Sequence, residues 1–267
     1  MRHLTACTAT RPRRLVIDCP RMWSDVVDLH EFYASALGQT ARRMIRRRLR
    51  ELWPDTRGQR VLGLGYAAPY LRPFMGEAER VSAMMPAAQG VVHWPPEGPN
   101  ATALVEEAEL PLADLSIDRV LLVHALEHAE QLRPFLREIW RVMAGGGRLL
   151  VVVPNRRGLW ARVDRTPFGR GHPYSADQLS RLLRDHMFQP LSTRTALYMP
   201  PVGWRLWLGS APAWERLGER WLERFAGVVM IEAGKQLYVP TALRASPARR
   251  LAPALPRAPA APSRGKI

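Results

Sequence analysis

The chain has 267 residues, 47% of them hydrophobic, and it carries a formal net charge of +15 at pH 7. This length and apolar content suffice for a domain with its own core and exclude a wholly disordered chain. It contains no run of 18 or more apolar residues and no apolar stretch after its first arginines, so we expect a cytoplasmic protein without a membrane span or secretory signal.

The positive charge is concentrated near the two ends of the chain. Residues 1–21 contain five arginines against one aspartate, and residues 241–267 contain five arginines and one lysine without any acid. An arginine excess of this kind is more typical of a GC-rich genome than of a phosphate-binding surface, so we predict no specific nucleic-acid partner. Cys7 and Cys19 both precede the core, which excludes a disulfide framework or thiolate metal site within it.

The distribution of apolar, charged and proline residues divides the chain into four segments. Residues 1–21 show no period and are expected to be a poorly ordered extension, with Met22 as an alternative start, although an ordered arm is the other possibility. Residues 22–54 form a helical segment whose arginines mostly face solvent. Residues 55–240 are the main domain, and residues 241–267 are a disordered tail rich in Pro, Ala and Arg.

Within the main domain, short apolar runs alternate with helical stretches. This alternation requires crossover connections and predicts a mostly parallel sheet. A helix over 132–143 is expected to end at an Ala-Gly-Gly-Gly C-cap, and Ser175 is expected to cap a helix over 177–186. The strands are predicted at 60–64, 80–84, 101–105, 119–123, 148–153, 191–198 and 228–239.

Two stretches carry a resemblance to a known family. The first is "VLGLGYAAPYL" at 61–71, a strand running into a glycine-containing loop, and the second is the segment 106–155, which contains Leu110-Pro111, "HALEH" at 124–128, and a strand ending in Pro-Asn. Together they resemble the class I S-adenosylmethionine-dependent methyltransferases, in particular the type 11 branch. The resemblance implies an α/β, Rossmann-like fold: a seven-stranded, mostly parallel sheet of order 3-2-1-4-5-7-6 with helices on both faces.

The resemblance also implies S-adenosylmethionine as cofactor and gives positions for its contacts. Gly65 matches the glycine that passes under the cofactor, Glu106 and Glu107 match the adenine contacts, and His124 matches the position beside the methionine part. The cofactor-binding residues implied are Gly63, Gly65, Tyr66, Glu106, Glu107, Leu110 and His124.

Three positions depart from the family pattern. Gly63 stands where the family usually has an acid, Ala67 where it has a glycine, and the second strand ends at Met84-Met85-Pro86 without the acid that binds the ribose. A charged hydrogen bond contributes roughly 1.5–3 kcal/mol, so we expect weaker cofactor binding than is usual for the family. A larger side chain at position 65 is expected to block the cofactor with little loss of fold.

The sequence His124-Ala-Leu-Glu127-His128 also has the spacing of an inverted zinc-protease helix, in which two imidazoles bind the metal. That arrangement requires both histidines on one helical face. Because His124 follows a buried strand directly, we expect it in a turn, with His128 as a structural histidine and no metal site.

The acceptor pocket of this fold usually follows the fourth and fifth strands. Candidate pocket residues are Asn155, Arg156 and Trp160, and His172 and Tyr174 are candidates for orienting or deprotonating the acceptor. The alternative for His172 and Tyr174 is that this segment only starts the next helix. The sequence leaves the catalytic residues unknown.

A tryptophan-rich insertion at about 203–225 precedes the last strand, and Trp214 and Trp221 lie on one helical stripe. This insertion could cover an apolar acceptor, bind a protein partner or lie at a membrane interface, or it could simply pack on its own domain. We expect Trp214 and Trp221 to cover the acceptor pocket. The sequence thus predicts a methyltransferase for a small-molecule acceptor, with a non-catalytic binding or regulatory module as the alternative.

Overall fold

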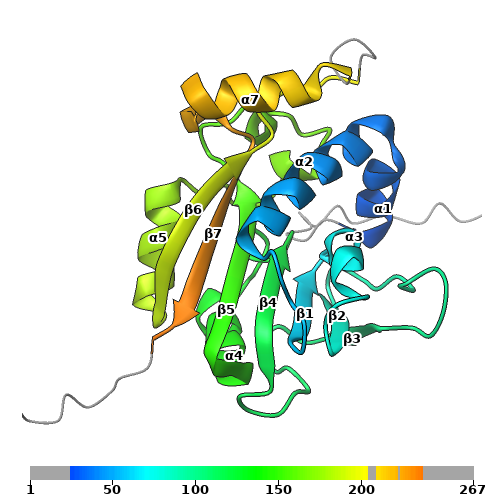
Figure 1. The fold of residues 1–267 in the computed structure, drawn as a ribbon, viewed down its shortest axis with the longest axis vertical. Helices are drawn as coiled ribbons and strands as arrows, with labels where there is room; N and C mark the ends of the chain where they lie inside the picture. The colour runs from blue at the N-terminus through cyan, green and yellow to red at the C-terminus, as the bar shows by residue number, and fades with distance from the viewer. Residues whose placement is uncertain (1–24, 204–208, 222, 237–267) are drawn as a thin grey trace, which may run out of the picture. The chain divides into compact units, whose positions relative to one another are not determined.

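The computed structural model describes residues 25–203, 209–221 and 223–236 (Figure 1). By internal contacts the chain divides into Met1–Gln236 and Leu237–Ile267, and the second unit lies wholly outside the described residues. The expectations for residues 1–21, for Met22 and for the tail at 241–267 therefore also lie outside them.

A seven-stranded sheet of order β3-β2-β1-β4-β5-β7-β6 organises the domain (Figure 1). β5 and β7 are antiparallel, as are β6 and β7, and the other neighbouring pairs are parallel. This order and the antiparallel β7 confirm the predicted fold class. The strands are β1 (Arg60–Gly65), β2 (Arg80–Pro86), β3 (Thr102–Val105), β4 (Ile117–Val123), β5 (Met143–Pro154), β6 (Phe188–Ala196) and β7 (Val228–Lys235).

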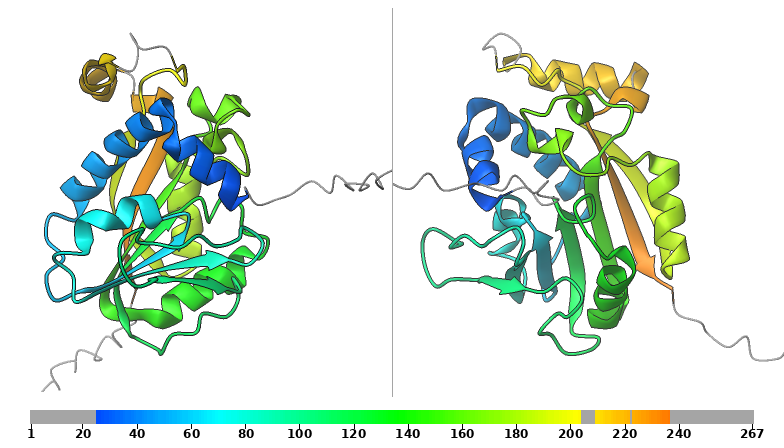
Figure 2. Two further views of the ribbon diagram at one scale, coloured as in Figure 1. Left: turned by 90° about the vertical axis from the view of Figure 1, so that its right-hand side faces the viewer. Right: turned by 180° about the vertical axis from the view of Figure 1, so that it is seen from behind.

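Alternate residues of the central strands supply two separate cores. Leu121 of β4 packs in the core that α2 covers with Ile45 and Leu49, whereas Leu122 packs in the core that α4 and α5 cover. The two further views show these helices on opposite faces of the sheet (Figure 2). The helices are α1 (Val26–Ala34), α2 (Ala36–Leu52), α3 (Ala68–Leu71), α4 (Leu132–Val142), α5 (Ala176–Asp185) and α7 (Ala211–Trp221), with 3-10 turns η1 (Arg72–Phe74), η2 (Trp160–Arg162), η3 (Pro167–Gly169) and η4 (Glu223–Phe225).

The N-terminal helical segment is split in two by Ser35. Its backbone N–H donates to the end of α1, and its hydroxyl accepts from Gly38 at the start of α2, so one residue caps both helices. The arginines of α2 also bind acids of the chain: Arg50 pairs with Glu77 and Arg48 with Glu51. The predicted cap at Ser175 is confirmed as a capping box with Gln178.

The predicted glycine C-cap of α4 is wrong. The helix ends at Val142, its C-cap residue Met143 already has an extended backbone (φ −69°, ψ 135°), and β5 runs from Met143 through the three glycines. Met143 pairs with Ile117 of β4, so the sheet ladder begins where the helix stops. None of the helices in the described part of the chain combines the length and the apolar character that crossing a bilayer requires.

Candidate functional site

The candidate site lies where the central strands β1 and β4 end side by side. Gly65 is the last residue of β1 and pairs with Val123, the last residue of β4. Gly65 has φ +74°, and a Cβ added there would lie 2.5 Å from the Val123 carbonyl oxygen and 2.9 Å from that of His124. Glycine is therefore required at this position because the two strand ends touch.

His124 begins the turn after β4 with a left-handed backbone (φ 49°), an unfavourable conformation for a residue with a side chain. Its ring is completely buried. The ring atom Nε2 lies 2.8 Å from the hydroxyl of Tyr33 on α1, and that hydroxyl lies 2.8 Å from the hydroxyl of Tyr70 on α3. These hydrogen bonds attach α1 and α3 to the end of β4.

Three tyrosines fill the space between α1 and the loop after β1. The ring of Tyr33 stacks on that of Tyr66 with centroids 5.6 Å apart, and it meets the ring of Tyr70 edge to face. Burial raises the pKa of Tyr66 to about 12, and burial together with Tyr70 raises the pKa of Tyr33 well above its usual value. Burial raises the pKa of Tyr70 as well, so all three phenols are neutral at physiological pH.

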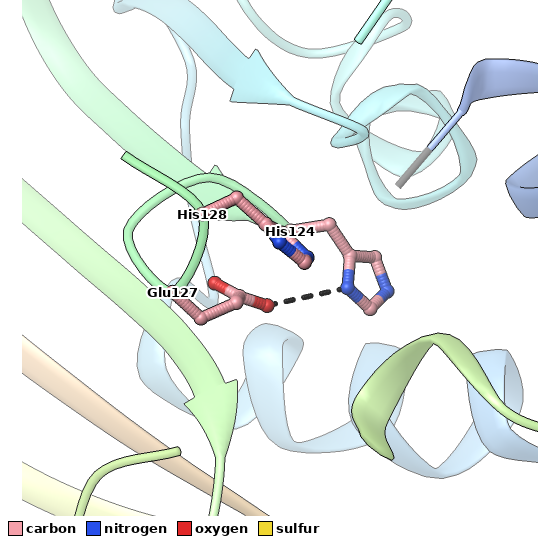
Figure 3. A group of neighbouring side chains, drawn as sticks. All are labelled: His124, Glu127 and His128. Carbon is pink, nitrogen blue, oxygen red and sulfur yellow. Dashed lines mark ion pairs between the residues drawn. The ribbon is translucent and has the colours of Figure 1, made fainter. Parts of the chain in front are cut away.

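Glu127 and His128 follow in the same turn and are also buried. The Glu127 carboxylate is directed at the His124 ring, with Oε1 3.3 Å from Nδ1, and the His128 ring lies beside both (Figure 3). Burial acts to raise the pKa of Glu127, but the adjacent His124 and His128 rings outweigh it, so the pKa lies below its usual value. Glu127 is therefore an ionised carboxylate in the interior.

The residues matched to the adenine contacts lie apart from this buried turn. Glu106 is exposed after β3, and Glu107 is half-buried. With Pro86 and Glu130 they line a hollow of about 140 Å³. Leu110 is buried in the core that α4 covers, and its backbone N–H donates to the Glu138 carboxylate on that helix.

Between the buried turn at His124 and the hollow beside Glu106, side chains of the protein itself lie at the carboxyl ends of β1, β2 and β4. The amide of Gln89, which follows β2, donates to the His124 carbonyl oxygen at 3.0 Å and is itself buried. At Gly63 an added Cβ would lie 2.7 Å from the side chains of Ala67 and Leu71, so the structure leaves no room for a larger side chain at this position. In the described conformation an open hollow lies beside Glu106 and Glu107, whereas Gln89 and Tyr33 both bond to His124 at the end of β4.

The predicted acceptor residues are divided between core and surface. Trp160 is fully buried, and its indole N–H donates to the Met199 carbonyl oxygen at 2.8 Å. Asn155 is buried, and its side-chain amide donates to the carbonyl oxygens of Arg224 and Ala226, which fixes the start of β7. Arg156 contacts Tyr174 through a hydrogen bond from its backbone N–H to the Tyr174 carbonyl oxygen.

His172 and Tyr174 lie on the segment that passes this turn. His172 is exposed, and its backbone N–H donates to the Glu127 carbonyl oxygen at 2.8 Å. Tyr174 is half-buried, and its pKa is raised by burial and by the charge of Glu127. Their roles toward an acceptor stay predictions.

A large hollow of about 1090 Å³ opens between α1, the 159–170 segment and Pro201–Gly203. Phe32 and charged residues, among them Asp28 and Arg170, line it, and the latter two form an ion pair. Phe168 packs on Phe32, which lines this hollow, and its ring centroid lies 4.9 Å from that of His124.

The roles of Tyr33 and Gln89 and the presence of this hollow were not anticipated from the sequence. The helical spacing of Val26, Leu29 and Tyr33 could have indicated that Tyr33 lies on the buried face of α1.

The tryptophan-rich insertion is described in part. α7 lies beyond the carboxyl end of β6, because it connects that end to the start of β7 (Figure 1). Trp214 is half-buried against the core, and the side chain of Trp221 lies outside the described residues. Glu215 accepts from the Tyr198 backbone, and Gly218 contacts the Tyr198 ring, so α7 packs on its own domain through these residues.

Comparisons with known proteins agree with this geometry. Residues 62–151 match the family model described as a methyltransferase domain. Probable S-adenosylmethionine-dependent methyltransferases from two strains of Mycobacterium tuberculosis are 41% identical over 83 residues, which is 30% of this chain and 30% of each relative. The match thus spans less than a third of the length of these curated relatives.

Solved structures share the fold at low sequence identity. A SAM-dependent methyltransferase from Thermotoga maritima, described as a possible histamine N-methyltransferase, is 16% identical, with 79% of this chain and 96% of that chain covered and a TM-score of 0.54. A SAM-dependent methyltransferase from Archaeoglobus fulgidus is 18% identical, with 73% and 94% covered and a TM-score of 0.52. At these identities the likeness concerns the fold alone.

Proposed function

We propose that this chain, which carries a methyltransferase domain of the class I fold, transfers a methyl group from S-adenosylmethionine to a small-molecule acceptor. The observation that carries the proposal is the strand order 3-2-1-4-5-7-6 formed around the matched residues 62–151. In open α/β sheets, ligands bind beyond the carboxyl ends of the strands, at the point where the order reverses. Here that point lies between β1 and β4.

The acceptor side of this proposal rests on the 1090 Å³ hollow. Methyl transfer is an in-line displacement, which needs alignment of two reactants and exclusion of water more than a dedicated acid or base. Phe32 supplies an apolar ring to the lining and packs on the buried Phe168 with ring centroids 6.1 Å apart, while Asp28, Arg162 and Arg170 supply charge. This lining suits an acceptor with an apolar body and a polar or charged end.

A non-catalytic binding or regulatory module is the second candidate. The specific observation that favours it is the filled strand ends: Gln89 bridges to His124, and Tyr33 occupies the space beside it. Both side chains must move before a whole cofactor molecule can lie between Gly65 and Glu106. The two candidates differ in one measurable property, which is affinity for S-adenosylmethionine.

Calorimetric titration of the full chain with S-adenosylmethionine tests the proposal. We expect binding weaker than about 1 µM, because the two family acids are absent. Glu106→Gln should weaken it about tenfold by removing a charged acceptor for the adenine amine, whereas Glu109→Gln, an exposed acid in the same turn, should leave it unchanged. No heat up to about 1 mM ligand would favour the non-catalytic module.

A further inference from the structure

The turn after β4 brings three metal-ligating side chains together in the interior. One ligand atom each from His124, Glu127 and His128 lie within 4.8 Å of one another, and the three residues are 0%, 1% and 2% exposed. Among the described residues, both carboxylate oxygens of Glu127 and the Nδ1 atom of His124 have no hydrogen-bond partner. The two imidazole rings offset the burial of this carboxylate electrostatically, but they leave its oxygens without hydrogen bonds, and an ion held among the three side chains would satisfy them.

The hydrogen bonds of Tyr33 limit which nitrogen of the His124 ring can carry a proton. Its single hydroxyl proton goes either to Tyr70 or to Nε2 of His124. If it goes to Tyr70, then Nε2 must donate to Tyr33, and in a neutral ring Nδ1 is left as a lone pair facing the Glu127 carboxylate. If it goes to Nε2, then Nδ1 of a neutral ring carries the proton, and its 3.3 Å contact with Oε1 is within ion-pair distance but lacks the geometry of a hydrogen bond.

A shared metal ion accounts for both the distance and the missing hydrogen bond. Ligand atoms at about 2.0–2.1 Å from a tetrahedral zinc ion lie about 3.3 Å from each other, because their lone pairs converge on the ion and not on one another. Two imidazoles and one carboxylate are a ligand set that divalent zinc, iron and cobalt all accept. The Tyr33 hydroxyl on Nε2 is the outer hydrogen bond that usually orients a metal-bound imidazole.

We propose that His124, Glu127 and His128 form a binding site for one divalent transition-metal ion of the zinc class. The sequence predicted no metal because His124 was expected in a turn and off the helical face of His128. His124 does lie in a turn, but its left-handed backbone brings its ring back toward Glu127 and His128, so a shared helix is unnecessary. The bound ion would fix this turn and, through Tyr33, the position of α1.

Metal analysis of the full, tag-free chain tests the site directly. A Cys7→Ser/Cys19→Ser background removes the two thiols that would compete for the ion. After dialysis against chelator, we expect one Zn²⁺ or Co²⁺ per chain, an intense visible Co²⁺ spectrum typical of low coordination number, and a Tm raised by about 5 °C or more with metal. If the Cys7→Ser/Cys19→Ser chain bound no stoichiometric metal, the proposed metal site would be rejected. This outcome does not depend on whether the chain binds S-adenosylmethionine.

Two variants assign the site to these side chains. Glu127→Gln should weaken Co²⁺ binding by more than the roughly 10–100-fold that loss of an outer-shell partner costs, because it removes a ligand charge. His93→Ala, which removes an exposed histidine outside the cluster, should leave the Co²⁺ affinity and spectrum unchanged. Equal Co²⁺ affinity in Glu127→Gln and the parent protein would place the metal elsewhere and reject the site.

Gly171 offers an independent test in which none of the three ligand residues is itself mutated. An added Cβ there would lie 2.9 Å from the His128 ring and 2.6 Å from the Glu127 carbonyl oxygen. Gly171→Ala should therefore displace the His128 ring and lower Co²⁺ affinity at least about tenfold. Gly58→Ala is the matched control, because Gly58 also has a positive φ but its Cβ would meet nothing within 4 Å. Identical Co²⁺ titrations of the two variants would contradict the site.

Discussion

Gly65→Ala is expected to lower the free energy of unfolding by about 3–5 kcal/mol, measured by urea denaturation of the full chain. About 1–2 kcal/mol of this comes from placing a side chain on a backbone with φ +74°. The rest comes from contact with the carbonyl oxygens of Val123 and His124, which β-sheet pairing holds in place and which cannot yield as a flexible side chain would. Loss of this size can exceed half of the stability of an ordinary domain.

Gly58→Ala separates these two causes. Gly58 shares the positive φ but has open space at its Cβ position, so only the backbone cost of about 1–2 kcal/mol is expected. If both variants lost the same stability, the contact between the ends of β1 and β4 would not be as tight as described. The expectation from the sequence, that a larger residue at 65 blocks a ligand with little loss of fold, is thereby corrected: the space beside Gly65 holds protein backbone.

The fold was predictable because its signals are local and repeated. Apolar runs such as 119–123 and 148–153, separated by helical periods, require a mostly parallel sheet, and the segment 106–155 determined its order through the family resemblance. The error at the end of α4 has a local cause. Glycines after a helix usually terminate it, but here Met143 pairs at once with Ile117, a partner 26 residues earlier that no local rule identifies.

The candidate site was predictable only in part, since it depends on contacts between distant segments. The position of His124 in a turn follows from the buried strand before it. Its hydrogen bond to Tyr33 joins residues 91 positions apart, and the left-handed backbone that aims its ring at Glu127 has no signature in a residue other than glycine. A rule that requires both histidines of a His-x-x-Glu-His motif to lie on one helix therefore misses the cluster of His124, Glu127 and His128, which a turn brings together.

Trp160→Ala is expected to lower the free energy of unfolding by about 3–5 kcal/mol, the usual cost of emptying a large aromatic site in a core. Trp160 is fully buried, its ring meets Phe168 edge to face at 5.5 Å, and an added Cβ on Gly227 would lie 2.4 Å from it, so the site is closely packed. Thermal and urea unfolding measure this loss.

Two further substitutions test whether Trp160 packs the core or lines an acceptor pocket. Trp160→Phe keeps most of the volume but leaves the buried Met199 carbonyl oxygen without its donor, so a loss of about 1–3 kcal/mol is expected. Trp214→Ala removes a half-buried side chain and should cost less than Trp160→Ala. An acceptor-pocket role for Trp160 would instead give nearly unchanged unfolding together with loss of acceptor binding. Because Leu159 and Arg162, and not Trp160, border the 1090 Å³ hollow, we expect stability to fall first and any ligand effect to follow from it.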